Sequence, residues 1–171
     1  MKRVQRLFRK YILSVDLLGA FLVAGIVHSF FDGIQYSAAK QIFEVSISVL
    51  SIVFSIFFAA LAILITAGDD DFINFMEENK NYTKIIGTFK YTLSVLFVGL
   101  VFSIVLFISV LDHDLSITPN LIFPKNWLVL HSLVVSYALL ATFLSIYDAI
   151  KYAEFRARFI NITKEKRESN S

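Results

Sequence analysis

The chain has 171 residues, of which 57% are apolar, 18% are charged and none is cysteine. About a quarter of the residues in a water-soluble domain are usually charged. Together with the mean hydropathy of +0.69, this composition indicates that lipid surrounds most of the protein. The net charge of +2 is too small for a nucleic-acid-binding protein. Without cysteine there is no disulfide, thiolate metal site or thiol nucleophile.

Four apolar runs are long enough to cross a bilayer as helices. A hydrocarbon core of about 30 Å requires about 20 helical residues, and a backbone in hydrocarbon must satisfy its own hydrogen bonds. We therefore predict an all-α integral membrane protein with four transmembrane helices, at residues 11–31, 42–67, 91–111 and 127–150. The first run is longer than the apolar part of a signal peptide, so we expect it to remain as an anchor.

The basic residues predict the orientation. Fourteen of the 16 Lys and Arg residues lie in the arm 1–10, the central segment 68–90 and the tail 151–171. Because basic residues collect on the cytoplasmic side, these three segments are predicted to be cytoplasmic, with both termini inside. The two outer loops, about 32–41 and 112–126, are too short for a folded external domain. The expected location is a bacterial inner membrane.

The cytoplasmic segments carry amphipathic patterns. In residues 68–90, apolar side chains recur at helical spacing and predict one or two helices, with a break at Asn79-Lys80-Asn81. The tail is predicted to continue the fourth helix and to become disordered over 164–171. These segments would pack on one another, lie in the lipid interface or dock a soluble partner. The acidic residues proposed to contact a cytoplasmic partner are Asp69, Asp70, Asp71, Glu77 and Glu78.

The Asp69-Asp70-Asp71 triplet stands where a helix would start, and the helix dipole favours negative charge there. A metal site is the alternative interpretation. Three adjacent carboxylates point in different directions and lack the spacing of a Ca²⁺ loop. We therefore predict no metal and no cofactor.

The second span carries a stripe of small and hydroxyl-bearing residues on one helical face. Small residues permit close helix approach in lipid, so this face is expected to meet another helix, either inside one four-helix bundle or along the pore of a homo-oligomer. The stripe consists of Ser48, Ser51, Ser55, Ala59, Ala62 and Thr66. Shorter stripes with the same expected packing role are Ala20 and Ala24, Gly99 and Ser103, and Ala138, Ala141, Ser145 and Ala149.

Five ionisable residues lie within the predicted spans, towards their ends: Asp16, His28, Glu44, His131 and Asp148. Such residues are costly in lipid and usually face the bundle or water. Asp148 is expected to pair with Lys151 one turn away or with Lys90 at a similar depth. Glu44 with His28 or His131 is a candidate outer cluster that titrates near neutral pH. A proton pathway would also need ionisable groups in the middle of the spans.

Catalytic motifs are not found. The sequence has no H-E-x-x-H, no Gly-x-Ser-x-Gly and no Gly-rich phosphate loop. Asp16 and Asp148 are the remaining candidate pair for intramembrane proteolysis, and both lie near the predicted cytoplasmic boundary. We therefore predict that the protein is not an enzyme.

The layout of a basic arm, four spans, the central loop Asp-Asp-Asp-Phe-Ile-Asn-Phe-Met-Glu-Glu and a short basic tail resembles that of small membrane proteins of bacterial anti-phage defence. Retron-associated transmembrane effectors and the tetraspan component of Kiwa are of this kind. The resemblance implies damage to the inner membrane after infection is sensed, or sensing on behalf of a cytoplasmic partner.

Three functional hypotheses follow, and each involves membrane lipids as partners. The first is a non-enzymatic, homo-oligomeric effector that depolarises the membrane when a cytoplasmic partner or signal acts on it. The second is a membrane anchor or sensor subunit that docks a soluble protein. The third is a small oligomeric channel or transporter, although no inverted repeat or broken helix supports it.

Overall fold

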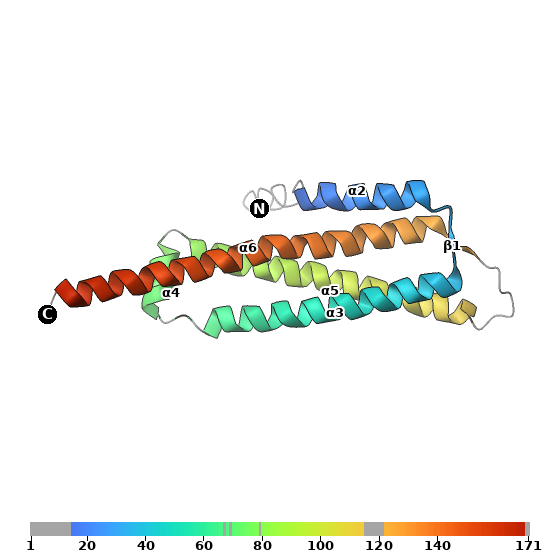
Figure 1. The fold of residues 1–171 in the computed structure, drawn as a ribbon. Helices are drawn as coiled ribbons and strands as arrows, with labels where there is room; N and C mark the ends of the chain where they lie inside the picture. The colour runs from blue at the N-terminus through green and yellow to red at the C-terminus, as the bar shows by residue number, and fades with distance from the viewer. Residues whose placement is uncertain (1–14, 67, 69, 79, 115–121, 170–171) are drawn as a thin grey trace, which may run out of the picture. The chain divides into compact units, whose positions relative to one another are not determined.

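A computed structural model describes residues 15–66, 68, 70–78, 80–114 and 122–169 (Figure 1). Almost all of these residues are helical. The elements are α2 (Val15–Phe30), β1 (Ile34–Gln35), α3 (Tyr36–Thr66), α4 (Asp70–Glu77), α5 (Asn81–Asp114), β2 (Ile122–Phe123) and α6 (Lys125–Ser169). The arm 1–10 and the first four residues of the first predicted span lie outside the described residues.

Within the described part of the chain, three helices are long and apolar enough to cross a membrane: Tyr36–Thr66, Asn81–Leu111 and Lys125–Glu165. They contain the third and fourth predicted spans and the second as far as Thr66, and each helix begins before its apolar run. α5 begins ten residues before the third predicted span. Its first turns belong to the amphipathic pattern of residues 68–90, which is helical as predicted. The described helix α2 has 16 residues and is about 24 Å long at 1.5 Å per residue.

The predicted continuation of the fourth span is confirmed, and the predicted disorder of 164–169 is wrong. α6 is a single helix of 45 residues, about 68 Å long at 1.5 Å per residue, and it is uninterrupted in Figure 1. Its polar last turns still contain good helix formers, Lys, Glu and Arg. A helix already nucleated by the membrane-embedded part extends through such residues without a new nucleation cost.

The described residues pack into two compact units. Unit 1 comprises Met1–Phe54 with Val95–Ala141, and unit 2 comprises Ser55–Ser94 with Thr142–Ser171. Each of the three long helices contributes to both units. The units are therefore described one at a time.

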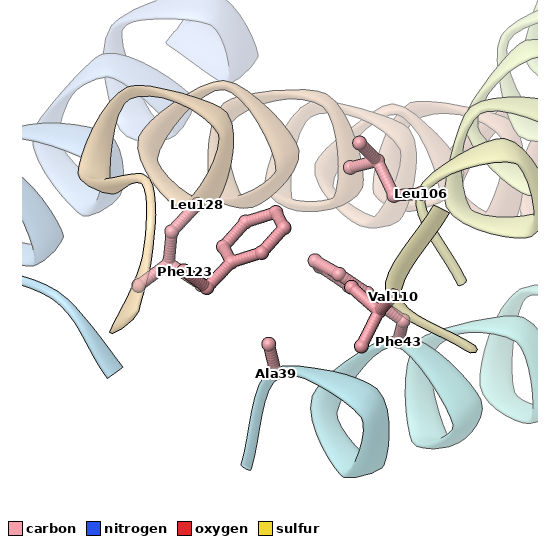
Figure 2. Packing of buried hydrophobic residues seen from close by; sticks show 6 residues of the cluster. All are labelled: Ala39, Phe43, Leu106, Val110, Phe123 and Leu128. Atoms are coloured by element: carbon pink, nitrogen blue, oxygen red, sulfur yellow. The ribbon is translucent and has the colours of Figure 1, made fainter. Parts of the chain in front are cut away.

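Unit 1 is centred on a cluster of buried apolar side chains. Figure 2 shows them directed into one shared space from α3, α5, β2 and the start of α6. The ring of Phe123 lies edge-on to the ring of Phe43, with centroids 5.4 Å apart. The cluster consists of Ala39, Phe43, Leu106, Val110, Phe123 and Leu128. A two-stranded antiparallel pair adjoins it, with Ile34 opposite Phe123 and Gln35 opposite Ile122.

This strand pair joins the two predicted outer loops through backbone hydrogen bonds. Phe123 in β2 then places a large side chain in the core. Gly33, just before β1, has a φ of 145°, a conformation that favours glycine. A Cβ there would also collide with the side chain of Ile122.

Unit 2 contains the amphipathic helix α4, whose apolar face is buried against α6. Phe72 lies 5.4 Å from Tyr152 and 5.5 Å from Phe159 between ring centroids, and Phe75 also lies 5.5 Å from Phe159. Phe72 and Met76 are almost fully buried. An isolated helix of eight residues is unstable in water, so this aromatic contact is what maintains α4.

The predicted break between the two helices of the central segment is confirmed. α4 ends at Glu77 and α5 begins at Asn81, while Lys80 between them has a φ of 55°. The carboxylate of Glu77 accepts hydrogen bonds from the backbone N–H of Thr83 at 3.1 Å and from its hydroxyl at 2.8 Å. Glu77 thereby satisfies an N–H group that the first turn of α5 leaves unpaired.

Candidate functional site

The small-residue stripe of α3 is on the surface of the chain. Five of its members, Ser48, Ser55, Ala59, Ala62 and Thr66, are exposed, and Ser51 is half-buried. Two hydroxyls donate to the helix's own backbone, Ser48 to Glu44 at 3.0 Å and Thr66 to Ala62 at 2.9 Å. The expectation that this stripe packs inside a single-chain bundle is therefore wrong.

A different face of α3 packs against the rest of the chain. Its large buried side chains are seven residues apart: Phe43, Leu50, Phe57 and Leu64. These large side chains make many more van der Waals contacts than Ser or Ala. In lipid the hydrophobic effect does not drive helices together, so van der Waals packing between side chains decides which face of a helix is buried.

The shorter small-residue stripes do pack within the chain, as expected. Ala20 and Ala24 are the buried residues of α2. Gly99 lets α3 and α6 approach α5, because a Cβ there would meet Ala138 at 3.5 Å and Leu50 at 3.6 Å. The members Ser103, Ala138, Ala141 and Ser145 are buried, and Ala149 is half-buried.

In unit 1 the buried polar contact is between α5 and α6. Nε2 of His131 lies 3.1 Å from Oγ of Ser103, and both residues are almost fully buried. The Ser103 hydroxyl donates its one hydrogen to the carbonyl of Gly99 at 2.9 Å. In the tautomer that carries the hydrogen on Nε2, the Ser103 oxygen accepts from Nε2–H. The ring of Phe43 lies edge-on, 4.6 Å from the His131 ring.

The candidate titrating cluster of Glu44 with a histidine does not form. His131 is enclosed by Ser103 and aromatic rings, whereas Glu44 on α3 and His28 on α2 are both exposed. All three side chains lie near the ends of predicted spans. This shared position does not bring them together, because the His131 side chain is buried and the other two are exposed.

In unit 2 a second buried polar contact joins the same two helices. The hydroxyls of Thr92 on α5 and Ser145 on α6 lie 2.7 Å apart, with exposed fractions of 1% and 0%. Thr88, one turn before Thr92, is also buried and donates to the carbonyl of Lys84. Ser145 belongs to a predicted small-residue stripe, whereas neither threonine was predicted to be buried, because β-branched Thr in an apolar run is also common on lipid-facing surfaces.

Asp16 and Asp148, the two aspartates within the predicted spans, are both half-buried. Asp16 lies in the first turn of α2. The predicted ion pair of Asp148 with Lys151 or Lys90 is wrong, since among the residues that the structure describes Asp148 has no salt bridge. The Lys151 ammonium instead lies over the ring of Tyr147, 4.4 Å from its centroid, in a cation–π contact.

The acidic residues of the central segment have different positions. Asp70 and Asp71 are exposed in the first turn of α4, where the helix dipole favours them. Glu78 is exposed, Glu77 caps α5, and Asp69 lies outside the described residues. Among the described residues, no group of three or more His, Asp or Glu side chains is placed to hold a metal ion.

Each unit contains a groove between its helices. In unit 1 an apolar groove of about 310 Å³ runs between α2, α3 and α6, past the edge of His131. In unit 2 a smaller groove of about 170 Å³ lies between the start of α5 and the middle of α6. Its lining includes both basic and acidic side chains, among them Asp148 and Lys151.

No protein-family model matches this chain, and neither a curated protein nor a solved structure shows significant similarity to it. Its function is therefore argued from its own residues.

Proposed function

We propose that this chain crosses a bacterial inner membrane four times, with both termini in the cytoplasm, and acts there as a homo-oligomeric, non-enzymatic effector that makes the membrane permeable. α2 is the first span in this proposal. The 14 of 16 basic residues in the arm, central segment and tail support the orientation. The resemblance to anti-phage membrane proteins supports a role in defence.

The observation that carries the proposal is the exposed hydroxyl stripe of α3. In a monomer, Ser48 and Ser55 would face hydrocarbon beside large exposed apolar residues such as Ile52 and Ile56. Small and hydroxyl-bearing residues are enriched where helices meet in membranes. A second copy of the chain offers the same face, and hydroxyls gathered around an axis can also contact water in a pore.

A membrane anchor that docks a soluble partner is the second candidate, and α6 favours it. This helix is about 68 Å long at 1.5 Å per residue, more than twice the roughly 30 Å hydrocarbon core. It continues well beyond the predicted span, and α4 packs on that extension through Phe72 and Phe159. The exposed Asp70 and Asp71 are available there to a partner.

Ion flux separates the two candidates. Co-expression with the neighbouring genes should collapse the membrane potential, and purified protein in proteoliposomes should release a trapped ion. We expect the triple variant S48A/S51A/S55A to lower the flux by about tenfold, since it removes the hydroxyls that would contact water. The matched control S94A/S109A removes two exposed hydroxyls from α5 and should leave the flux unchanged. An anchor would give no flux in any variant.

A further inference from the structure

We propose that the unit 2 groove binds the headgroup of an amine-bearing phospholipid of the phosphoethanolamine type. The groove is formed by the first turns of α5 and by the part of α6 around and beyond the end of the fourth predicted span. It is lined by Asn81, Lys84, Ile85, Asp148, Lys151, Glu154, Phe155 and Arg158. This inference rests on the proposed position of the chain in a membrane, but not on its permeability to ions.

The charges that line the groove are left open to a ligand. Lys84, Lys151 and Arg158 supply three positive charges, and Asp148 and Glu154 supply two negative ones. Glu154 and Arg158 have the i,i+4 spacing at which helical ion pairs usually form. Within the described part of the chain, however, none of these five side chains forms a salt bridge. A groove with unpaired charges of both signs complements a ligand with charges of both signs.

The groove begins at the lipid headgroup layer and extends beyond it. The fourth predicted span ends at Ile150, so Lys151, Glu154 and Arg158 lie about 1.5, 6 and 12 Å beyond the hydrocarbon along α6. The headgroup region of a bilayer is about 5 to 8 Å thick on each side. Tyr147, which supports the Lys151 ammonium, lies where aromatic side chains mark the membrane interface.

The chemistry of the lining selects one class of headgroup. Phosphate oxygens accept charge-assisted hydrogen bonds from Lys151 and Arg158, and a primary ammonium donates to carboxylates such as Asp148. A quaternary choline ammonium has no N–H to donate, and a glycerol headgroup has no cation for the carboxylates. The volume of about 170 Å³ is the space of roughly six water molecules at about 30 Å³ each, which accommodates a phosphate and a short amine.

Lipid selectivity tests the proposal with the full-length chain. The protein is reconstituted in nanodiscs that contain phosphatidylethanolamine, phosphatidylcholine and phosphatidylglycerol in equal amounts with identical acyl chains. It is then extracted in mild detergent, and the retained lipids are quantified by mass spectrometry. We expect phosphatidylethanolamine to be enriched about fivefold over the other two, a ratio of the size that one additional polar contact gives.

Two pairs of charge-removing variants locate the site. K151Q with R158Q should lower retention of all three lipids, because the phosphate loses two of the three basic side chains that line the groove. D148N with E154Q should remove the preference for phosphatidylethanolamine over phosphatidylglycerol, because the ammonium loses its acceptors. The matched control K164Q with E165Q changes two exposed charges further along α6 and should change nothing. Circular dichroism and thermal unfolding verify that each variant keeps its fold.

Equal retention of the three lipids by the wild-type chain would overturn the proposal, as would unchanged retention in K151Q with R158Q. Binding of free O-phosphoethanolamine by a chain that shows no enrichment of phosphatidylethanolamine in the nanodiscs would assign the site to a soluble ligand and overturn the lipid. If the chain does not enter nanodiscs, the proposed membrane function is refuted as well. If the chain enters nanodiscs but shows no lipid selectivity, only this inference is refuted.

Discussion

α3 and α5 are both long apolar helices with hydroxyl-bearing residues at helical spacing, but they use those residues in opposite ways. α5 buries Thr92 and Ser103 against α6. α3 exposes Ser48 and Ser55 and buries large apolar side chains instead. The difference shows that a periodic stripe of hydroxyl residues predicts a helix face that contacts a partner. The stripe does not tell whether that partner lies in the same chain.

The partners explain the difference. Ser103 meets an imidazole and Thr92 meets another hydroxyl, so these two buried polar groups on α5 have polar partners on α6. The α3 stripe instead returns the hydroxyls of Ser48 and Thr66 to its own backbone. Its packing face is the set of large residues that includes Leu50, which leaves the stripe for a surface outside the chain.

The largest effect should come from the buried face of α3. Leu50→Ala removes a fully buried side chain that lies beside Gly99. In water-soluble cores this change costs about 2 to 5 kcal/mol. Because lipid rather than water receives the exposed surface here, we expect about 2 kcal/mol of lost unfolding free energy, measured by denaturation with SDS in mixed micelles. Ile52→Ala, at a 61% exposed position of the same helix, is the control, and an equal loss there would contradict the assignment of the packing face.

An intermediate effect is expected at the Ser103–His131 contact of α5. Ser103→Ala leaves Nε2–H of His131 without its acceptor, and leaving a buried polar group unpaired costs about 1 kcal/mol or more. Ser109→Ala is a close control, because Ser109 makes the same backbone hydrogen bond at 2.9 Å on the exposed side of α5. Its unfolding free energy should remain within about 0.5 kcal/mol of the wild-type value. If both variants unfold alike, the contact does not stabilise unit 1.

The smallest effect should come from the Thr92–Ser145 contact in unit 2. A double-mutant cycle of Thr92→Val and Ser145→Ala isolates the energy of this hydrogen bond. Such bonds between membrane helices average about 0.6 kcal/mol, with a maximum near 1.7, and we expect a coupling energy in this range. A coupling of zero would show that shape alone holds these two helices together.

Much of the fold was predictable because lipid imposes simple rules on a sequence. Length and apolarity were enough to predict the helices α3, α5 and α6, and amphipathic spacing was enough for α4 and for the break before Asn81. The shorter stripes predicted the close approach at Gly99 and the burial of Ser145. These features depend on local periodicity, which a single sequence contains.

The remaining features depend on which segments meet in space, and the sequence does not encode that locally. The pairing of Ile34 with Phe123 joins residues far apart in the chain. The choice of Leu50 over Ser51 as the buried face of α3 depends on the shape of the opposing helices. The wrongly expected pair of Asp148 with Lys151 shows the same limit, because Tyr147 offered the ammonium a competing contact.

Cysteine cross-linking in native membranes tests most directly whether the α3 stripe faces a second copy of the chain, because the natural sequence contains no cysteine. Single cysteines at the stripe positions Ser48, Ser55 and Ala62 are compared with cysteines at the next residues, Val49, Ile56 and Ile63, which are also exposed. We expect strong disulfide-linked dimers from the three stripe positions and weak ones from their neighbours. Equal yields at all six positions, or higher yields at the neighbours, would contradict the account.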